Sequence, residues 1–265
     1  MKITKLKTTK LAIENKSIYH YSLGALKGTN TVLVEIETDE GICGVGEVTG
    51  GINVDALDIF LKSSEPLLIG ESPFDIERFL DRFYRHHKLT RLLPFATNLS
   101  CGIEMALWDI AGKVAGVPVY KLLGGKIRDR VRVYNGNIRF PLEGNQPEHY
   151  AQAMQKMKDL PERFSIIKQA VAFHDSMYSN VDKFYYGTPV TEGRYPNRGM
   201  LTEKGFKHLL KCVEAMADVL DDEVGLALDC GPGMTVGDAL KLAKAVEGMN
   251  VTWLEDMITG DYTPY

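Results

Sequence analysis

The sequence predicts an α+β domain of antiparallel strands and helices over residues 1–129, followed over residues 130–265 by the first half of a TIM-type parallel α/β barrel. In the first part, short apolar runs are joined by a tight turn and then give way to helical periodicity. In the second part, strand-like and helix-like segments alternate, which is typical of βα units in one parallel sheet. Two of those strands end in a carboxylate, at the edge where the functional sites of such barrels lie.

The composition excludes several classes of protein. Of the 265 residues, 45% are hydrophobic and 25% are charged, as in an ordinary soluble globular chain. The net charge of −4 predicts neither a nucleic-acid partner nor an anionic membrane surface. No apolar run approaches the roughly 20 residues of a spanning helix, and the start lacks a signal-peptide core. The four cysteines are scattered and never form a Cys-x-x-Cys pair, so we expect reduced thiols in a cytoplasmic protein.

The first domain is predicted to begin as an antiparallel meander. Its strands are residues 3–13, 31–37 and 42–47, with a turn at residues 38–41. Residues 16–28 and 49–53 are predicted to be irregular loops. We expect their side chains His20, Tyr21 and Asn53 to help select a substrate, because such loops can vary without disturbing the scaffold. The alternative is that these are surface residues without a ligand.

Helices are predicted to complete this domain. They cover residues 75–86, the stretch around 99–110, and a short segment opened by Pro118 and ended at Gly124. Met105 and Trp108 are expected to pack in the core of the domain.

The second domain is predicted to hold barrel strands one to four. The strands are residues 131–135, 164–171, 224–229 and 251–255, and the helices between them are residues 147–160, 202–220 and one capped by Thr235. The buried face of that last helix is predicted to be Ala239, Leu240, Ala243 and Val246. The long segment 173–200 is rich in tyrosine, and we expect it to pack over the mouth of the barrel or against a neighbouring subunit.

The two carboxylates at strand ends predict a metal site. Asp229 ends the third strand of this domain, and Glu255 ends the fourth. Because parallel strands end on the same side of a barrel, these side chains should converge on one point. Oxygen ligands that converge without histidine or cysteine favour a hard cation, above all Mg²⁺.

Several motifs resemble one known family. Leu-Asp-Cys-Gly at 228–231 and Trp-Leu-Glu-Asp at 253–256 resemble the first and second metal-ligand strands of the enolase superfamily, in its mandelate racemase / muconate lactonizing enzyme and acid-sugar dehydratase branch. Residues 103–113 and 116–125 look like the end of the N-terminal cap domain of those enzymes. The resemblance implies a cap domain over residues 1–129 and a modified (β/α)7β barrel after it.

The resemblance also implies a chemistry. Enolase-type enzymes remove a proton from the carbon next to a carboxylate, and a divalent metal stabilises the enediolate that results. For this chain, it implies Mg²⁺ at Asp229 and Glu255, a small-molecule sugar acid as substrate, and a homo-oligomer. The product would be a 2-keto-3-deoxy acid, formed when an acid expels the neighbouring hydroxyl.

The base is less clearly marked. The second barrel strand of the family often ends in Lys-x-Lys, and here Lys168 matches the first lysine while Ala170 stands at the second. This departure favours a dehydratase over a racemase or epimerase, because a racemase needs proton-transfer groups on both faces of the α-carbon. The candidates for proton transfer are Lys168, His174 and a loop tyrosine, with Tyr178 near the substrate. Alternatively, Lys168 is a structural ion-pair partner of a metal ligand.

The second domain is too short for a complete barrel. Residues 130–265 are about half of the roughly 250 residues of a full barrel. The third metal ligand and a later base would lie on strands five to eight. We therefore expect a truncated chain or one part of a longer gene product, and the alternative to an enzyme is a non-catalytic fragment that acts only through association.

Overall fold

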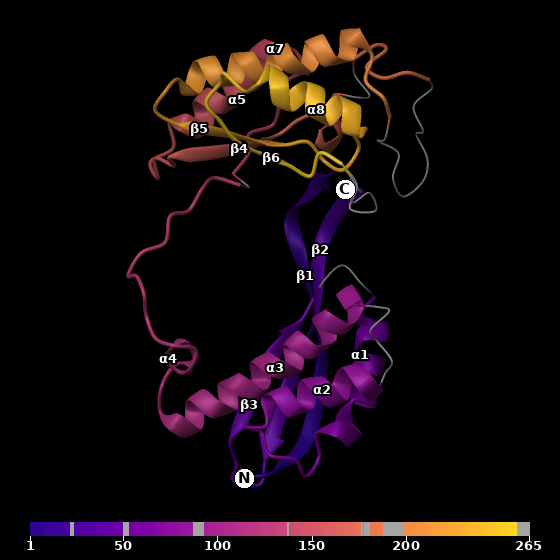
Figure 1. Ribbon diagram of the computed structural model, residues 1–265, viewed down its shortest axis with the longest axis vertical. Coiled ribbons are helices and arrows are strands. Elements are labelled where there is room, and N and C mark those ends of the chain that lie inside the picture. The colour runs from indigo at the N-terminus through magenta and orange to yellow at the C-terminus, as the bar shows by residue number, and fades with distance from the viewer. Residues whose placement is uncertain are drawn as a thin grey trace. The chain divides into compact units, whose positions relative to one another are not determined.

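The computed structural model describes residues 1–21, 24–49, 53–86, 93–136, 138–175, 177, 181–187 and 199–258, without the side chains of residues 17–26, 86 and 93–95. The chain divides into two compact units (Figure 1). Unit 1 holds residues 1–18 and 26–130, and unit 2 holds residues 19–25 and 131–265. Among the described residues, every helix is too short or too polar to traverse a bilayer.

Unit 1 is an antiparallel sheet with helices packed on it. Its strands are β1 (Ile3–Tyr21), β2 (Gly24–Thr38) and β3 (Cys43–Val48), in the order β1-β2-β3. Its helices are α1 (Val54–Ser63), η1 (Glu65–Leu67), α2 (Ile76–His86), α3 (Leu93–Ala115) and α4 (Val119–Leu122). The core of this unit gathers Val34, Ile36, Phe83, Leu99 and Ile103, all buried.

Helix α3 lies directly on β3 because both elements carry glycine at their contact. A Cβ at Gly44 would lie 2.0 Å from the carbonyl oxygen of Ala106, and one at Gly46 would lie 1.9 Å from that of Gly102. Any larger residue at these positions would push the helix away from the strand. Asp109 then ties the two elements together, because its Oδ2 accepts hydrogen bonds from the backbone of Val45 and from Lys113.

Unit 2 is a parallel sheet covered by helices. The strands β4 (Ile166–Ala170), β5 (Gly225–Asp229) and β6 (Val251–Glu255) are parallel and adjacent in that order. The helices are α5 (Pro147–Lys158), η3 (Ala172–His174), α7 (Glu203–Leu220) and α8 (Val236–Ala245). Figure 1 shows α5 and α7 side by side over one face of this sheet. The helices and the sheet share one core, which buries Tyr150, Met154, Leu209, Val213 and Leu226.

The predicted fold class is confirmed: an antiparallel sheet with helices precedes a partial parallel barrel. Several helix ends follow the predicted chemistry as well. The hydroxyl of Thr235 caps α8 by accepting a hydrogen bond from the backbone of Asp238, and Gly116, which follows α3, has a φ of 66°.

The prediction of a loop at residues 16–28 is wrong. Strand β1 continues to Tyr21 and β2 already begins at Gly24, so the segment belongs to a long two-stranded hairpin. Its pairing escaped detection because residues 10–16 are all exposed and show no alternation of apolar and polar side chains. Backbone hydrogen bonds hold such a ribbon together, and they leave little trace in a sequence.

Three further predictions need correction. The first barrel strand is reduced to one parallel bridge between Asn135 and Ile167, since Val131 is 71% exposed and forms no ladder. On α8, Leu240 is 59% exposed and Leu242 is buried in its place, so the predicted face was rotated. Met105 is exposed rather than in the core. Helix α1 was not predicted, because its apolar stripe is short.

Candidate functional site

Asp229 and Glu255 lie side by side, as the sequence pattern predicts. The register pairs Asp229 of β5 with Glu255 of β6 on one side and with Ala170 of β4 on the other. These three positions form one row at the carboxyl end of the sheet. Since neighbouring strands are only about 4.8 Å apart, the two carboxylates share one small space.

A second row of residues lies two positions earlier on the same three strands, and it includes a lysine that points toward the acids. Because side chains alternate along a strand, Lys168, Ala227 and Trp253 share the face of Ala170 and the two acids, and the register aligns them across the sheet. Lys168 reaches both acids: its Nζ lies 2.6 Å from Oε1 of Glu255 and 3.3 Å from Oδ2 of Asp229.

The electrostatics of this cluster favour an ammonium at Lys168. The side chains of Lys168 and Asp229 are 10% and 7% exposed, and that of Glu255 is 31% exposed. Burial alone would lower the pKa of Lys168, but the hydrogen bond to Glu255 and the charge of Asp229 outweigh it and raise the pKa. Burial would raise the pKa of Glu255, but its hydrogen bonds from Lys168 and Trp253 lower it overall. One cation therefore faces two carboxylates, and the cluster keeps a surplus negative charge.

His174 approaches Asp229 from the turn that follows β4. The carbonyl oxygen of Cys230 accepts hydrogen bonds from the backbone N–H groups of Phe173 and His174, at 3.2 and 3.1 Å. Gly231 must be glycine there, because its φ is 62° and a Cβ would lie 2.8 Å from the backbone nitrogen of His174. The turn places Nδ1 of His174 3.6 Å from Oδ1 of Asp229. Burial lowers the pKa of His174, and the charge of Asp229 offsets this only in part, so the imidazole is neutral at pH 7.

The oxygen atoms of this site fit a hard cation. Asp229, Glu255 and Asp256 each offer one carboxylate oxygen, and these atoms all lie within 4.8 Å of one another. Oδ1 of Asp229 is buried and has no hydrogen-bond partner among the described residues. A buried carboxylate oxygen left in this way is costly unless a cation or a donor completes it. The donor set is all oxygen, which suits Mg²⁺ better than Zn²⁺ or Cu²⁺.

Sequence reasoning missed two members of this cluster. Asp256 ends the motif at 253–256 and was not predicted to be a ligand; alternation along a strand would turn its side chain away from that of Glu255. Its φ of 49° breaks that alternation. Trp253 begins the same motif and was not predicted to take part in the site. Its indole Nε1 donates a hydrogen bond of 3.0 Å to Oε2 of Glu255. The sequence could have indicated this contact, because side chains two residues apart on a strand lie on the same face of the sheet.

The remaining predicted residues are not brought to this cluster by the described part of the chain. Asn53 caps α1: its Oδ1 accepts hydrogen bonds from the backbone of Asp55 and Ala56. His20 and Tyr21 end β1, but their side chains lie outside the described residues, and Tyr178 lies outside them altogether. Their role with a substrate stays a prediction.

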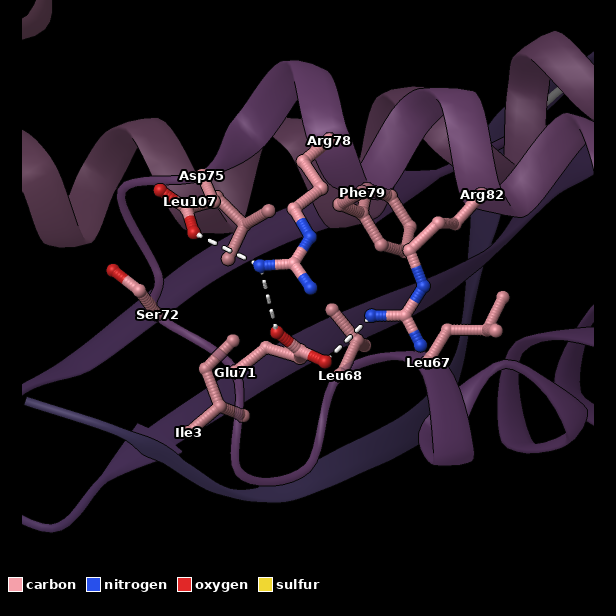
Figure 2. Close-up of a pocket in the computed structure, with 10 residues that line it drawn as sticks. All are labelled: Ile3, Leu67, Leu68, Glu71, Ser72, Asp75, Arg78, Phe79, Arg82 and Leu107. Atoms are coloured by element: carbon pink, nitrogen blue, oxygen red, sulfur yellow. Dashed lines mark hydrogen bonds and ion pairs between the residues drawn. The ribbon is translucent and has the colours of Figure 1, made fainter.

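Unit 1 holds a small hollow of a different kind (Figure 2). Figure 2 shows Glu71 between two arginines: its Oε1 lies 2.6 Å from Arg82, and its Oε2 lies 3.6 Å from Arg78. The volume is about 10 Å³, which is room for about one water molecule. This hollow is too small for a sugar acid, and its charges are already paired.

Known proteins resemble both units. Residues 4–124 match the model of the mandelate racemase / muconate lactonizing enzyme N-terminal domain. A D-xylonate dehydratase of Haloferax volcanii is 30% identical over 86% of this chain and 50% of its own length. A D-mannonate dehydratase of Caulobacter sp. strain K31 is 32% identical over 88% of this chain and 57% of its own length. The chain thus spans about half the length of the curated relatives it matches.

Solved structures extend the likeness to the whole fold. A structure described as a putative dehydratase from Mesorhizobium loti has a TM-score of 0.68 at 28% identity, and covers 98% of this chain and 60% of its own. A member of the enolase superfamily from Polaromonas sp. JS666 has a TM-score of 0.71 at 25% identity, with coverage of 98% and 60%. These matches confirm the resemblance that residues 228–231 and 253–256 suggested: the chain is similar to the mandelate racemase branch of the enolase superfamily, and residues 4–124 match the N-terminal domain of that family.

Proposed function

We propose that the protein dehydrates a sugar acid to a 2-keto-3-deoxy acid with the help of Mg²⁺. The observation that carries this proposal is the pairing of Asp229 with Glu255 at the carboxyl end of two parallel strands, with an unpartnered buried oxygen on Asp229. The names of the relatives support the substrate class, since they are dehydratases of D-xylonate and D-mannonate.

Asp229 and Glu255 would hold the cation, and Asp256 offers a third oxygen from the same chain. When bound, the cation polarises the substrate carboxylate and stabilises the negative charge that develops as the α-proton leaves. The protein's part is to hold both carboxylates at one point and to keep Glu255 ionised. Lys168 does this by hydrogen bonding to Glu255 and by placing its charge beside Asp229.

Proton transfer is assigned to His174 rather than to Lys168. A lysine or histidine must be unprotonated before it accepts a proton, and the raised pKa of Lys168 keeps it protonated. The lowered pKa of His174 keeps it neutral at pH 7. If Nδ1 carries the proton and faces Asp229, Nε2 is left to accept the α-proton. Tyr178 remains the alternative donor to the leaving hydroxyl.

Dehydration is favoured over racemisation because, in the described part of the site, the second lysine of Lys-x-Lys is missing. Ala170 stands next to Asp229 in the upper row, where a lysine would complete Lys-x-Lys, and a methyl group exchanges no proton. A dehydratase needs only one α-proton removed and an acid for the leaving hydroxyl.

The test is incubation of the protein with Mg²⁺ and a panel of aldonic and aldaric acids in D₂O. The proposal expects a 2-keto product, detected by NMR. Deuterium exchange at the α-carbon with inversion and without a keto product would show a racemase or epimerase instead. The predicted homo-oligomer and cytoplasmic location stay predictions, which light scattering and cell fractionation can test.

A further inference from the structure

We propose that Trp253 is a positioning residue of the metal site, which holds the Glu255 carboxylate in one orientation through its indole N–H. The inference rests on the proposed function, since it deepens the assignment of Glu255 as a metal ligand. It concerns a residue that touches neither substrate nor metal and acts only through Glu255.

Both oxygens of Glu255 are held from the layer below. Oε2 accepts the hydrogen bond from Nε1 of Trp253 at 3.0 Å, and Oε1 accepts the one from Nζ of Lys168 at 2.6 Å. Trp253 and Lys168 lie in one row, on either side of Ala227. The carboxylate is therefore gripped at both atoms by groups that come from two different strands. Each oxygen keeps a lone pair for a cation.

The indole is itself held in place. The ring of Tyr134 packs edge-on against Trp253, with centroids 5.0 Å apart and an angle of 80° between the rings. The same ring lies 5.9 Å from Nζ of Lys168. Tyr134 is fixed by its neighbour Asn135, whose backbone N–H donates to Ile166 and whose carbonyl oxygen accepts from Lys168. One aromatic ring thus contacts both donors of the Glu255 carboxylate.

An indole suits this position because it can only donate. Its N–H requires an acceptor, so it favours the ionised form of Glu255, which is also the form that binds a metal. Removing a residue that hydrogen-bonds to a metal ligand typically lowers the metal affinity about 10–100-fold. We expect the lower end of that range here, because Lys168 would still hold one oxygen of Glu255.

The chain provides a matched control. Its only other tryptophan, Trp108 of α3, also donates from Nε1 to a carboxylate, Oε1 of Glu104, at 3.3 Å. That pair lies in unit 1, whereas the acidic group lies in unit 2. Trp108→Phe removes the same kind of hydrogen bond as Trp253→Phe, so any general cost of losing an indole N–H appears in both variants.

The experiment is a calorimetric titration of the protein with Mn²⁺ alone, as a stand-in for Mg²⁺. Trp253→Phe should weaken Mn²⁺ binding about 10-fold, and Trp108→Phe should leave it unchanged. Trp108→Phe also leaves Trp253 as the sole tryptophan, so its emission should change as Mn²⁺ binds, along the same titration curve.

The outcomes separate this inference from the function on which it rests. If Trp253→Phe binds Mn²⁺ as the wild type does while Glu255→Gln loses binding, the positioning role is overturned and the metal site stands. If Glu255→Gln binds as tightly as the wild type, the metal site itself is wrong. Should circular dichroism show that Trp253→Phe is unfolded, Tyr134→Leu replaces it, since losing the ring against the indole should also weaken Mn²⁺ binding. Unchanged affinity in a folded Tyr134→Leu would then contradict the inference.

Discussion

Two ion-pair clusters in this protein each place one charged group between two groups of opposite charge. In unit 1, one carboxylate, Glu71, lies between the guanidinium groups of Arg78 and Arg82. In unit 2, one ammonium, Lys168, lies between the carboxylates of Asp229 and Glu255. The arginines of the first cluster are partly exposed to water, whereas Lys168 and Asp229 are buried.

The difference in burial separates a structural cluster from a candidate site. Ion pairs near water contribute at most about 1 kcal/mol, because solvent screens the charges. Arg78 also lies 3.7 Å from Asp75, so its charge is balanced by two carboxylates and is exposed to water. Surplus negative charge beside Asp229 is shielded from water, and a bound cation would satisfy it. The two clusters should consequently respond very differently to the loss of one member.

The largest effect is expected for the carboxylates at the strand ends. Asp229→Asn and Glu255→Gln should each abolish turnover, because each replaces an anionic metal ligand with a neutral amide. The fold should be retained, because the amide has nearly the same shape as the carboxylate. Steady-state kinetics with saturating Mg²⁺ and circular dichroism check both parts. Near-normal turnover in either variant would show that the pair is not the metal site.

Loss of the bridging ammonium should destabilise the protein next most strongly. Lys168→Met leaves two carboxylates facing each other without their shared cation, and removing one partner of a buried pair costs about 3–5 kcal/mol. Urea unfolding in EDTA should reveal this loss, and saturating Mg²⁺ should restore part of it. An unchanged free energy of unfolding in EDTA would mean that water already reaches the pair.

The pH dependence of stability should reveal His174. Because its folded pKa lies below the ordinary value of 6.5, the unfolded chain binds a proton first as the pH falls. Stability in EDTA should therefore decline below pH 6.5, by up to about 1.4 kcal/mol per pH unit, until the folded pKa is passed. His174→Asn should flatten this part of the profile. The same slope in both proteins would refute the burial of a neutral imidazole.

The smallest effect is expected in unit 1. Arg82→Met should change the free energy of unfolding by no more than about 1 kcal/mol, since Glu71 keeps Arg78 and lies near water. Its Mn²⁺ affinity should equal that of the wild type. A loss as large as that of Lys168→Met would erase the distinction drawn between the clusters.

Most of the correct predictions came from the alternation of strand-like and helix-like segments and from the residues at the strand ends. The alternation after residue 130 predicted the parallel strands β4, β5 and β6, and the acids that end two of them predicted their neighbourhood. Turn and cap residues such as Thr235 marked helix ends, because their side chains bond locally.

What escaped prediction depends on contacts between distant residues or on single dihedral angles. Around residues 10–16, where the side chains are exposed, the pairing of β1 with β2 rests on backbone hydrogen bonds. Within the predicted first barrel strand, residues 131–135, the structure shows one bridge, from Asn135 to Ile167. The grip of Trp253 on Glu255 depends on register and rotamer, and the position of Asp256 depends on one left-handed residue.

The central claim is that the acids at the strand ends of unit 2 bind a divalent cation and that the Glu71 cluster of unit 1 binds none. Isothermal titration with Mg²⁺ at pH 7.5 of the wild type, Asp229→Asn and Glu71→Gln tests it most directly. The account predicts saturable binding to the wild type, loss of that binding in Asp229→Asn, and wild-type binding in Glu71→Gln. Equal affinity in all three proteins, or no saturable binding to the wild type, would contradict it.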